Sequence, residues 1–408
     1  MPKAAKPVSR RHGEPLFHHR SFTRDEPQQA LDPRDPQATD PLTRPENALA
    51  QETPEPRKGM PSPQLDEATF RQRFLARYVD PAFDTLTGEL DKIAGAAWEG
   101  YSNHRKSPRT EKAGAGYSDP DYHLAADWIH AKAACAAAQA RHDDKNGPCR
   151  VLIVNGSSRS EHSCPGEMSK SYRLADISRE VMEAGGIDVE ILDLSRLTSE
   201  YGRQIHPCKA CFSTAAPLCH WPCSCYPNYS LGQTDDWMNE IYPKWIQAHG
   251  VMIITPVNWY QVSSPMKAMM DRLVCADGGN PDPTLTHGKD AKKAKEVELA
   301  GWDYPKHLND RVFSVIVHGD VEGAENVRRS VSDWLRFMDL VPAGINAEMD
   351  RYIGYWQPYA TNHDALDKDL AIQEEVRNAA RTLMEAAHAN HAGTLLMAGQ
   401  SLKPPRQK

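Results

Sequence analysis

From Arg150 onward, short apolar runs alternate with longer helical patterns, and this alternation constrains the fold more than any other feature. The apolar runs, which predict strands, lie at 150–156, 188–194, 251–256, 311–319 and within 341–349. Helical patterns follow at 168–184, 235–249, 263–274, 324–340 and 364–391. Such alternation predicts an α/β fold with a parallel sheet that helices cover on both faces.

The chain before this alternation divides into two parts. Residues 1–66 hold 12 of the 31 prolines and equal numbers of basic and acidic residues, 10 of each. We expect this arm to be disordered or to lie over a partner subunit, because it buries too little apolar surface to fold alone. Residues 67–148 have helix-like apolar spacing and predict a helical extension. We expect the main domain to span 149–391 and a loose basic tail to span 392–408.

Charge and hydropathy exclude several functional classes. The net charge is −7, which gives no case for a nucleic-acid or anionic-membrane partner. No stretch approaches the roughly 18 consecutive apolar residues of a membrane helix. The basic first residues, 1–13, lead into no apolar segment, so we see no signal peptide and expect a cytoplasmic protein.

The loop after the first predicted strand carries the groups of an anion site. Its sequence is NGSSRSEHSCPGEMSKS (155–171), and a helical pattern follows it. Gly156 allows a tight turn, several serines offer hydroxyls, and Arg159 offers a fork of donors. Backbone N–H groups at a helix N-terminus complete such a site. The loop matches neither the P-loop nor the GxGxxG dinucleotide motif.

Two further loops are expected at the same edge of the sheet, where ligands of open parallel sheets bind. After the third strand, Asn258, Trp259 and Tyr260 place aromatic faces beside polar edges. A planar heteroaromatic ligand needs both. After the fourth strand, His318, Gly319 and Asp320 face the same crevice.

These three loops resemble those of the flavodoxin-like NAD(P)H-dependent FMN reductases, a family related to iron–sulfur flavoproteins and quinone reductases. The matching motifs are GSSR (156–159), PVNW with SPMKAMMDR (256–272) and HGD (318–320). The resemblance implies a doubly wound five-stranded parallel sheet of order 2-1-3-4-5. It implies that the FMN phosphate is held by Ser157, Arg159, Ser169, Lys170 and Ser171. It also implies that the flavin ring is lined by Pro256, Val257, Asn258, Trp259 and Tyr260, with His318, Gly319 and Asp320 nearby.

The same resemblance implies an activity. An FMN-dependent oxidoreductase of this family takes two electrons from NAD(P)H and passes them to a small acceptor such as a quinone or a flavin. We assign no catalytic side chain; Tyr260 and His318 are only candidates for proton delivery. The long extension before the α/β domain favours a homo-oligomer. Two alternatives remain open: an electron-transfer protein with a cluster and a protein partner, and a non-catalytic flavin sensor.

Five of the nine cysteines crowd into one segment, HPCKACFSTAAPLCHWPCSC (206–225). Cys208 and Cys211, and Cys219 and Cys223, are spaced as metal-chelating pairs, with Cys225 nearby. A zinc or iron–sulfur site is chemically possible. Thr214 stands where the related iron–sulfur flavoproteins have a third cysteine, so we assign no metal ligand and keep a plain thiol-rich loop open. Because the segment follows the second strand, we expect it near the flavin edge.

Overall fold

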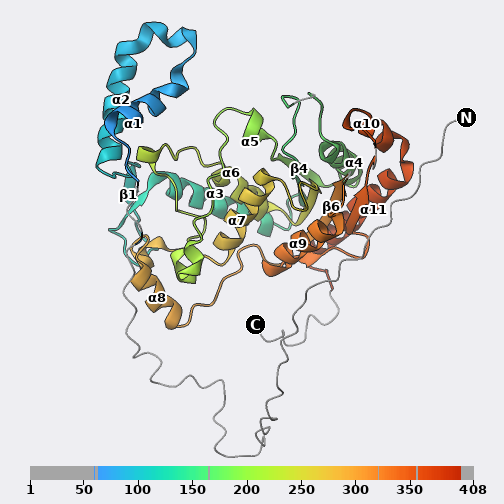
Figure 1. Cartoon of the computed structure of the whole chain (residues 1–408). Coiled ribbons are helices and arrows are strands. Elements are labelled where there is room, and N and C mark those ends of the chain that lie inside the picture. Colours follow the sequence, from blue (N-terminus) through green and yellow to red (C-terminus); the bar gives the residue numbers. More distant parts are fainter. Residues whose placement is uncertain (1–58, 60–62, 164–165, 320, 355–356, 397–408) are drawn as a thin grey trace, which may run out of the picture. The chain divides into compact units, whose positions relative to one another are not determined.

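The centre of the computed structural model is a parallel sheet, shown in Figure 1. The structure describes residues 59, 63–163, 166–319, 321–354 and 357–396. The strands run in the order β4-β3-β5-β6, and two short strands, β7 and β8, both pair with β6. The strand first in this series along the chain thus lies between the second and the third, which confirms the expected order 2-1-3-4-5. The strands span Arg150–Asn155 (β3), Asp188–Asp193 (β4), Gly250–Pro256 (β5), Val312–Gly319 (β6), Val341–Pro342 (β7) and Glu348–Tyr352 (β8).

The fifth sheet position differs from the single strand expected within 341–349. Two short strands share it, because the chain turns between them. Gly344 has φ +155° there, and its carbonyl accepts from the N–H of Ala347 at 3.1 Å. The longer strand, β8, therefore starts later than expected and ends at Tyr352.

Alternate residues of each strand feed two hydrophobic cores. Val151 and Ile153 face one core, and Leu152 and Val154 face the other. The first core lies under α4 and α11, which lie side by side, and the second lies under α6, α7 and α9. This period of two on a sheet covered on both faces explains the nearly continuous apolar runs in the sequence. The helices span Lys170–Ala184 (α4), Met238–Gln247 (α6), Ser264–Asp277 (α7), Ala324–Phe337 (α9) and Leu370–His391 (α11).

The last helical pattern, expected as one helix over 364–391, forms two helices. They span Tyr359–Lys368 (α10) and Leu370–His391 (α11). Asp369 separates them, and its carboxylate accepts from the N–H of Ile372 at 3.0 Å as an N-cap. A carboxylate that caps a new helix competes with continuation of the old one. Two short helices, Arg196–Ser199 (α5) and Ala291–Leu299 (α8), were not expected from the sequence.

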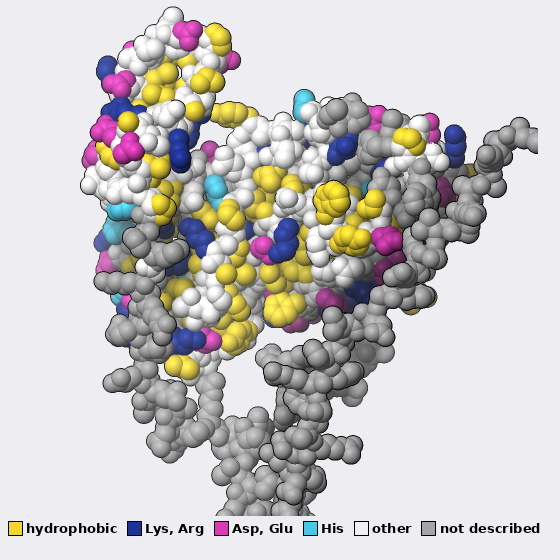
Figure 2. Space-filling model, in the orientation of Figure 1, with side chains coloured by type: hydrophobic (Ala, Val, Ile, Leu, Met, Phe, Trp, Pro, Cys, Tyr) yellow, Lys and Arg dark blue, Asp and Glu magenta, His cyan; other side chains and the backbone are white. Residues whose placement is uncertain are grey.

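The helical extension contains two separate structures. Helices Glu67–Leu75 (α1) and Thr87–Ser102 (α2) contact each other through their own aromatic cluster, in which Phe70 lies 4.8 Å from Tyr101 and 5.4 Å from Trp98 between ring centres. Figure 2 shows hydrophobic side chains on the surface of these two helices. A small hairpin follows, formed by Thr110–Lys112 (β1) and His123–Ala125 (β2).

Helix Ala126–Asp143 (α3) belongs to the core of the α/β domain, not to an independent appendage. It packs on α6, and Trp128, Cys135 and Ala138 are buried. The indole N–H of Trp128 donates to the carbonyl of Pro222 at 2.9 Å. The sheet therefore uses this part of the extension to close its core. Among the described helices, none is long and apolar enough to cross a membrane.

Candidate functional site

A cavity of about 270 Å³ lies beyond the carboxyl ends of β3, β5 and β6. Ten of the thirteen residues expected in the site line it, together with Ser158. They are Ser157, Arg159, Ser169, Lys170, Ser171, Pro256, Val257, Asn258, His318 and Gly319. Asp320, which was also expected, lies outside the described residues. Trp259 and Tyr260 do not line the cavity.

The first loop leaves β3 in close contact with the neighbouring strand β5. The N–H of Gly156 donates to the carbonyl of Ile254 at 2.8 Å. A Cβ atom at position 156 would stand 2.7 Å from Oγ1 of Thr255, so glycine is required for this approach. The Ser263 hydroxyl, which caps α7, donates to the carbonyl of Gly156 at 2.5 Å. The first and second loops are therefore joined at their bases.

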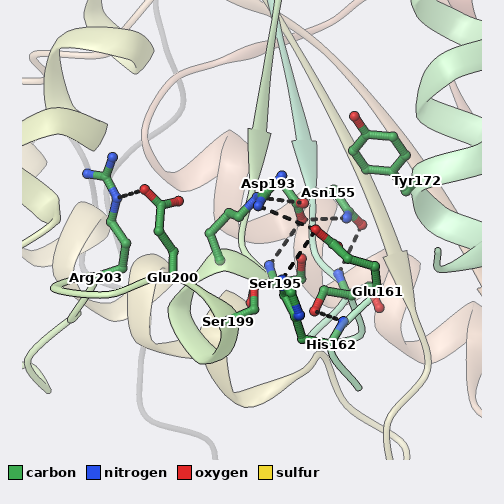
Figure 3. Close-up of polar contacts among 12 residues, drawn as sticks. Asn155, Glu161, His162, Tyr172, Asp193, Ser195, Ser199, Glu200 and Arg203 are labelled. Carbon is green, nitrogen blue, oxygen red and sulfur yellow. Dashed lines mark hydrogen bonds and ion pairs between the residues drawn. The ribbon is translucent and has the colours of Figure 1, made fainter. Parts of the chain in front are cut away.

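A polar network fixes the same loop from the side of β4 (Figure 3). Nδ2 of the Asn155 side chain donates to Oδ1 of Asp193 at 2.8 Å. Oδ1 of the same side chain accepts from the backbone N–H of Ser157 at 3.2 Å. Arg196 lies 3.6 Å from both Asp193 and Glu161, so it joins the end of β4 to the first loop. Side chains at the ends of β3 and β4 and at the start of α5 thus hold the first loop in place.

The N-terminus of α4 supplies the most strongly positive part of the cavity. Ser169 is the N-cap, and its hydroxyl oxygen accepts from the N–H of Tyr172 at 3.0 Å. Lys170 follows at the first helical position, and it is only 6% exposed. A helix N-terminus already carries positive potential, and the ammonium group of Lys170 adds to it. Arg159 adds a third positive contribution, and no described residue lining the cavity is acidic.

Ser171 and His318 form a buried pair at the floor of the cavity. Nε2 of His318 lies 2.7 Å from Oγ of Ser171, and the two residues are 3% and 0% exposed. Nδ1 of His318 is buried and has no hydrogen-bond partner. Burial, with smaller contributions from Lys170 and His363, lowers the pKa of His318 to about 3, so the imidazole is neutral at pH 7.

Trp259 and Tyr260 instead form an exposed two-residue turn. Asn258 and Gln261 bond to each other across it at 2.7 and 3.0 Å, and the two aromatic residues have φ +48° and +64°. Both are therefore in the left-handed region, which costs a non-glycine residue roughly 1–2 kcal/mol. Tyr260 rests against Gly323, while the Trp259 side chain is 93% exposed. The fold itself thus gives the indole almost no packing partner.

The cysteine segment contributes nothing to this cavity. The eight cysteines in the described part of the chain are free thiols. Cys208 hydrogen-bonds with Cys275, which lies in the last turn of α7, whereas the loop before the first turn of α7 borders the cavity. The expected position near the flavin edge is therefore wrong, because the segment packs at the opposite end of this helix. Within the described ranges, no group of three or more His, Cys, Asp or Glu side chains is arranged to hold a metal ion.

The decisive comparison is with a family model. Residues 149–347 match the model of the NADPH-dependent FMN reductases. These residues belong to that family. FMN and NAD(P)H, which the sequence led us to expect, are the cofactor and co-substrate of the family. The matched part includes the three loops around the cavity and the whole cysteine segment.

Solved structures to which the chain is similar at low identity include the following three. RosB with a bound formylated riboflavin-5′-phosphate intermediate has 16% identity and a TM-score of 0.41, over 60% of this chain and 81% of that one. The NADH:FMN oxidoreductase EmoB has 12% identity and a TM-score of 0.33, over 59% of this chain and 90% of that one. The NAD(P)H:quinone oxidoreductase of Methanothermobacter marburgensis has 15% identity and a TM-score of 0.31, over 60% of this chain and 96% of that one. The sequence matches no curated protein.

Proposed function

We propose that the cavity holds the phosphate end of FMN and that the protein passes two electrons from NAD(P)H to a small acceptor. One observation carries this proposal: Arg159, Lys170 and the N-terminus of α4 converge with buried serine hydroxyls on one cavity. A phosphate dianion supplies negative charge and acceptor oxygens that complement this set of donors and cations. Bound FMN supplies the redox chemistry, by accepting a hydride and returning the electrons.

His318 sets the direction of the Ser171 hydroxyl. Ser171 has a single O–H, and it can donate to a phosphate only when His318 donates to its oxygen through Nε2–H. The lowered pKa of His318 keeps the ring neutral, so the ring has one proton to place. With that proton on Nε2, Nδ1 is a bare acceptor, in agreement with its lack of a partner. We assign His318 this positioning role at the phosphate.

The second and third loops define where the flavin ring leaves the cavity. Pro256 and Val257 give an apolar wall beside Asn258, which offers an amide to ring heteroatoms. Trp259 stands just beyond this wall and is exposed, so its indole is placed to contact the ring or an aromatic acceptor outside the cavity. Quinones, nitroaromatics, azo compounds and free flavins are planar acceptors of this kind.

The direct test is turnover by the purified chain loaded with FMN. NADH and NADPH oxidation is followed without oxygen, in the presence of a benzoquinone, a nitroaromatic, an azo dye or free FMN. We expect oxidation of at least one nicotinamide with at least one of these acceptors. FMN-loaded protein that oxidises neither nicotinamide with any of them would contradict the proposal and favour a non-catalytic flavin sensor.

We also propose that the chain forms a homo-oligomer through the α1–α2 pair. Val79 and Ile93 in this region are 78% and 50% exposed, although the pair already has its own aromatic core. Light scattering on the full chain and on the Val79→Glu, Ile93→Glu double variant tests this. We expect an oligomer that the double variant weakens, whereas a monomeric full chain would rule it out.

A further inference from the structure

The cysteine segment contains thiols arranged in pairs. Sγ of Cys211 lies 3.2 Å from Sγ of Cys225. Cys208 forms a second such contact, a hydrogen bond with Cys275 at the end of α7. A third cysteine, Cys223, also hydrogen-bonds with Cys225. In the described part of the chain, no group of three or more His, Cys, Asp or Glu side chains is arranged to hold a metal ion, whereas the sulfur atoms of Cys211 and Cys225 are in direct contact.

The Cys211–Cys225 pair is asymmetric in a way that separates an attacking thiol from a resolving one. Cys211 is half-buried, whereas Cys225 is only 7% exposed. The hydrogen bond from Cys225 lowers the pKa of Cys211 to about 7, and the charge of Lys289 contributes. Burial raises the pKa of Cys219 well above its usual value, and the hydrogen bond with Cys225 and burial do the same for Cys223. Cys211 is therefore accessible and partly thiolate at neutral pH.

Lys106 and Lys289 interact electrostatically with this pair, and Lys209 interacts with Lys106. Burial lowers the pKa of Lys106, and the charges of Lys209 and Lys289 contribute to this lowering. Nζ of Lys289 donates to the carbonyl of Leu218 at 2.9 Å, so its ammonium is fixed in place. Lysines that repel one another at a site with reactive thiols favour anions, whether a thiolate or a negatively charged substrate.

We propose that Cys211 and Cys225 form a redox-active dithiol that reduces disulfides carrying carboxylate groups. The Cys211 thiolate attacks one sulfur of the disulfide, which forms a mixed disulfide and releases the other half as a thiolate that takes a proton from water. Cys225 then loses its proton to water and attacks Sγ of Cys211. The second half leaves as a thiolate, which takes up from water a proton equivalent to the one that Cys225 lost, and a Cys211–Cys225 disulfide remains. The dithiol gives two electrons and two protons in total, and the substrate disulfide accepts both. This exchange needs neither FMN nor NAD(P)H.

The test uses the full chain, reduced with dithiothreitol, freed of the reductant and mixed with oxidised glutathione. We expect release of two glutathione thiols per chain and a peptide map that links Cys211 to Cys225. Cys225→Ser is expected to retain a glutathione adduct on Cys211, because the resolving thiol is absent. Cys211→Ser is expected to form neither the adduct at that site nor the link. Cys149→Ser is the matched control, because Cys149 is 4% exposed and burial raises its pKa to about 11.

Substrate charge gives an independent measurement on the unmodified protein. Cystamine is a cationic disulfide, and we expect wild-type protein to react with it about tenfold more slowly than with oxidised glutathione. Lys209→Gln and Lys289→Gln should narrow this difference, and so should added salt.

Four results would overturn the proposal. Wild-type protein could form its disulfide between Cys208 and Cys275 while Cys211 and Cys225 stay reduced. Glutathione adducts could persist on wild-type Cys211 without resolution. Cystamine could react as fast as oxidised glutathione. Purified protein could hold zinc or iron stoichiometrically, with Cys211 and Cys225 protected from alkylation until the metal is removed.

Discussion

The cavity beyond β3, β5 and β6 and the cysteine segment lie at opposite ends of α7, and they are built in different ways. At the cavity, the polar side chains lie within or just after the end of a strand or at the start of a helix, as with His318 in β6, Ser157 after β3 and Ser169 at the start of α4. The cysteine segment has only short 3₁₀ turns, and its thiols meet through contacts far apart in the sequence, such as Cys208 with Cys275. Regular elements thus fix the cavity, whereas tertiary packing alone fixes the thiols.

This difference leads to a functional separation. The cavity contains hydroxyls, cations and a neutral imidazole, which suit an anion that must be held. The cysteine segment contains reactive sulfur beside lysine charges, which suits a ligand that is chemically changed and released. The two regions should therefore respond to different substitutions, and the experiments below are arranged from the largest expected effect to the smallest.

The largest effect is expected for Arg159→Ala. A charged hydrogen bond to a phosphate contributes roughly 1.5–3 kcal/mol, so the FMN dissociation constant should rise about 10- to 100-fold without unfolding of the domain. Flavin fluorescence titration measures it. Arg179→Ala is the matched control, because Arg179 pairs with Asp176 on the outer face of α4 and should leave binding unchanged. An FMN dissociation constant of the Arg159 variant equal to that of the wild type would show that the phosphate binds elsewhere.

Two histidines, the buried His318 at the cavity and the partly buried His307 next to the cysteine segment, allow a closer comparison. Burial lowers the pKa of His318 to about 3 and that of His307 to about 4, and His307 stacks on Trp221 beside the cysteine segment. In the unfolded chain these histidines bind protons once the pH falls below the ordinary histidine pKa of about 6.5. In the native protein they stay neutral until the pH approaches their lowered pKa values. Their contribution to stability is therefore present above pH 6.5 and is lost as pH falls toward 4.

Both His318→Gln and His307→Gln should reduce the loss of stability between pH 8 and pH 5, as measured by urea unfolding. Only His318→Gln should alter FMN binding, because it changes the partner that orients the Ser171 hydroxyl. Disturbing one hydrogen bond of this kind weakens binding by roughly 2- to 12-fold. Riboflavin binding should not change. An equal effect on FMN and riboflavin would instead place His318 at the ring.

Trp259→Ala should weaken FMN and riboflavin equally and modestly. An aromatic contact contributes about 0.5–1.5 kcal/mol beyond burial, which corresponds to roughly 2- to 12-fold in affinity. The flavin fluorescence of the complex should change as well. Tyr201→Ala is a suitable control, because Tyr201 is fully exposed and belongs to neither region. Unaltered affinity and spectra for the Trp259 variant would show that the turn does not contact the flavin.

The smallest effect is expected when Cys208 and Cys211 are both replaced by serine. The thiols pack at the far end of α7, so the FMN dissociation constant should stay within about twofold of wild type. The same variant should lose disulfide reduction. Loss of FMN binding in this variant would show that the cysteine segment and the cavity form one site.

The sequence was informative where local rules decide the structure. The parallel sheet and the loops that border the cavity followed from apolar runs, the glycine at 156 and the position of loops after strands, since the carboxyl ends of parallel strands meet at one edge. The strand order and the full set of ten cavity residues came instead from the resemblance to the FMN reductases. The cap by Ser263 had a local signal too, a serine shortly before a proline at a helix start.

Other features had no local signal. The Asn155–Asp193 contact joins the ends of two strands across the loop and helix between them. The exposed turn at Trp259 and Tyr260 is not predicted by the usual residue preferences of turns, because two bulky residues occupy positions that usually hold asparagine and glycine. The place of the cysteine segment depended on packing against α7, which spacing between cysteines does not reveal.

The relative affinity of the wild-type protein for FMN and riboflavin tests the central claim most directly. The two ligands share the ring and the ribityl chain and differ only in the phosphate that we assign to Arg159, Lys170 and the N-terminus of α4. The account predicts that FMN binds at least about tenfold more tightly than riboflavin, and that Arg159→Ala reduces this ratio. Equal dissociation constants for the two ligands in the wild-type protein would contradict it.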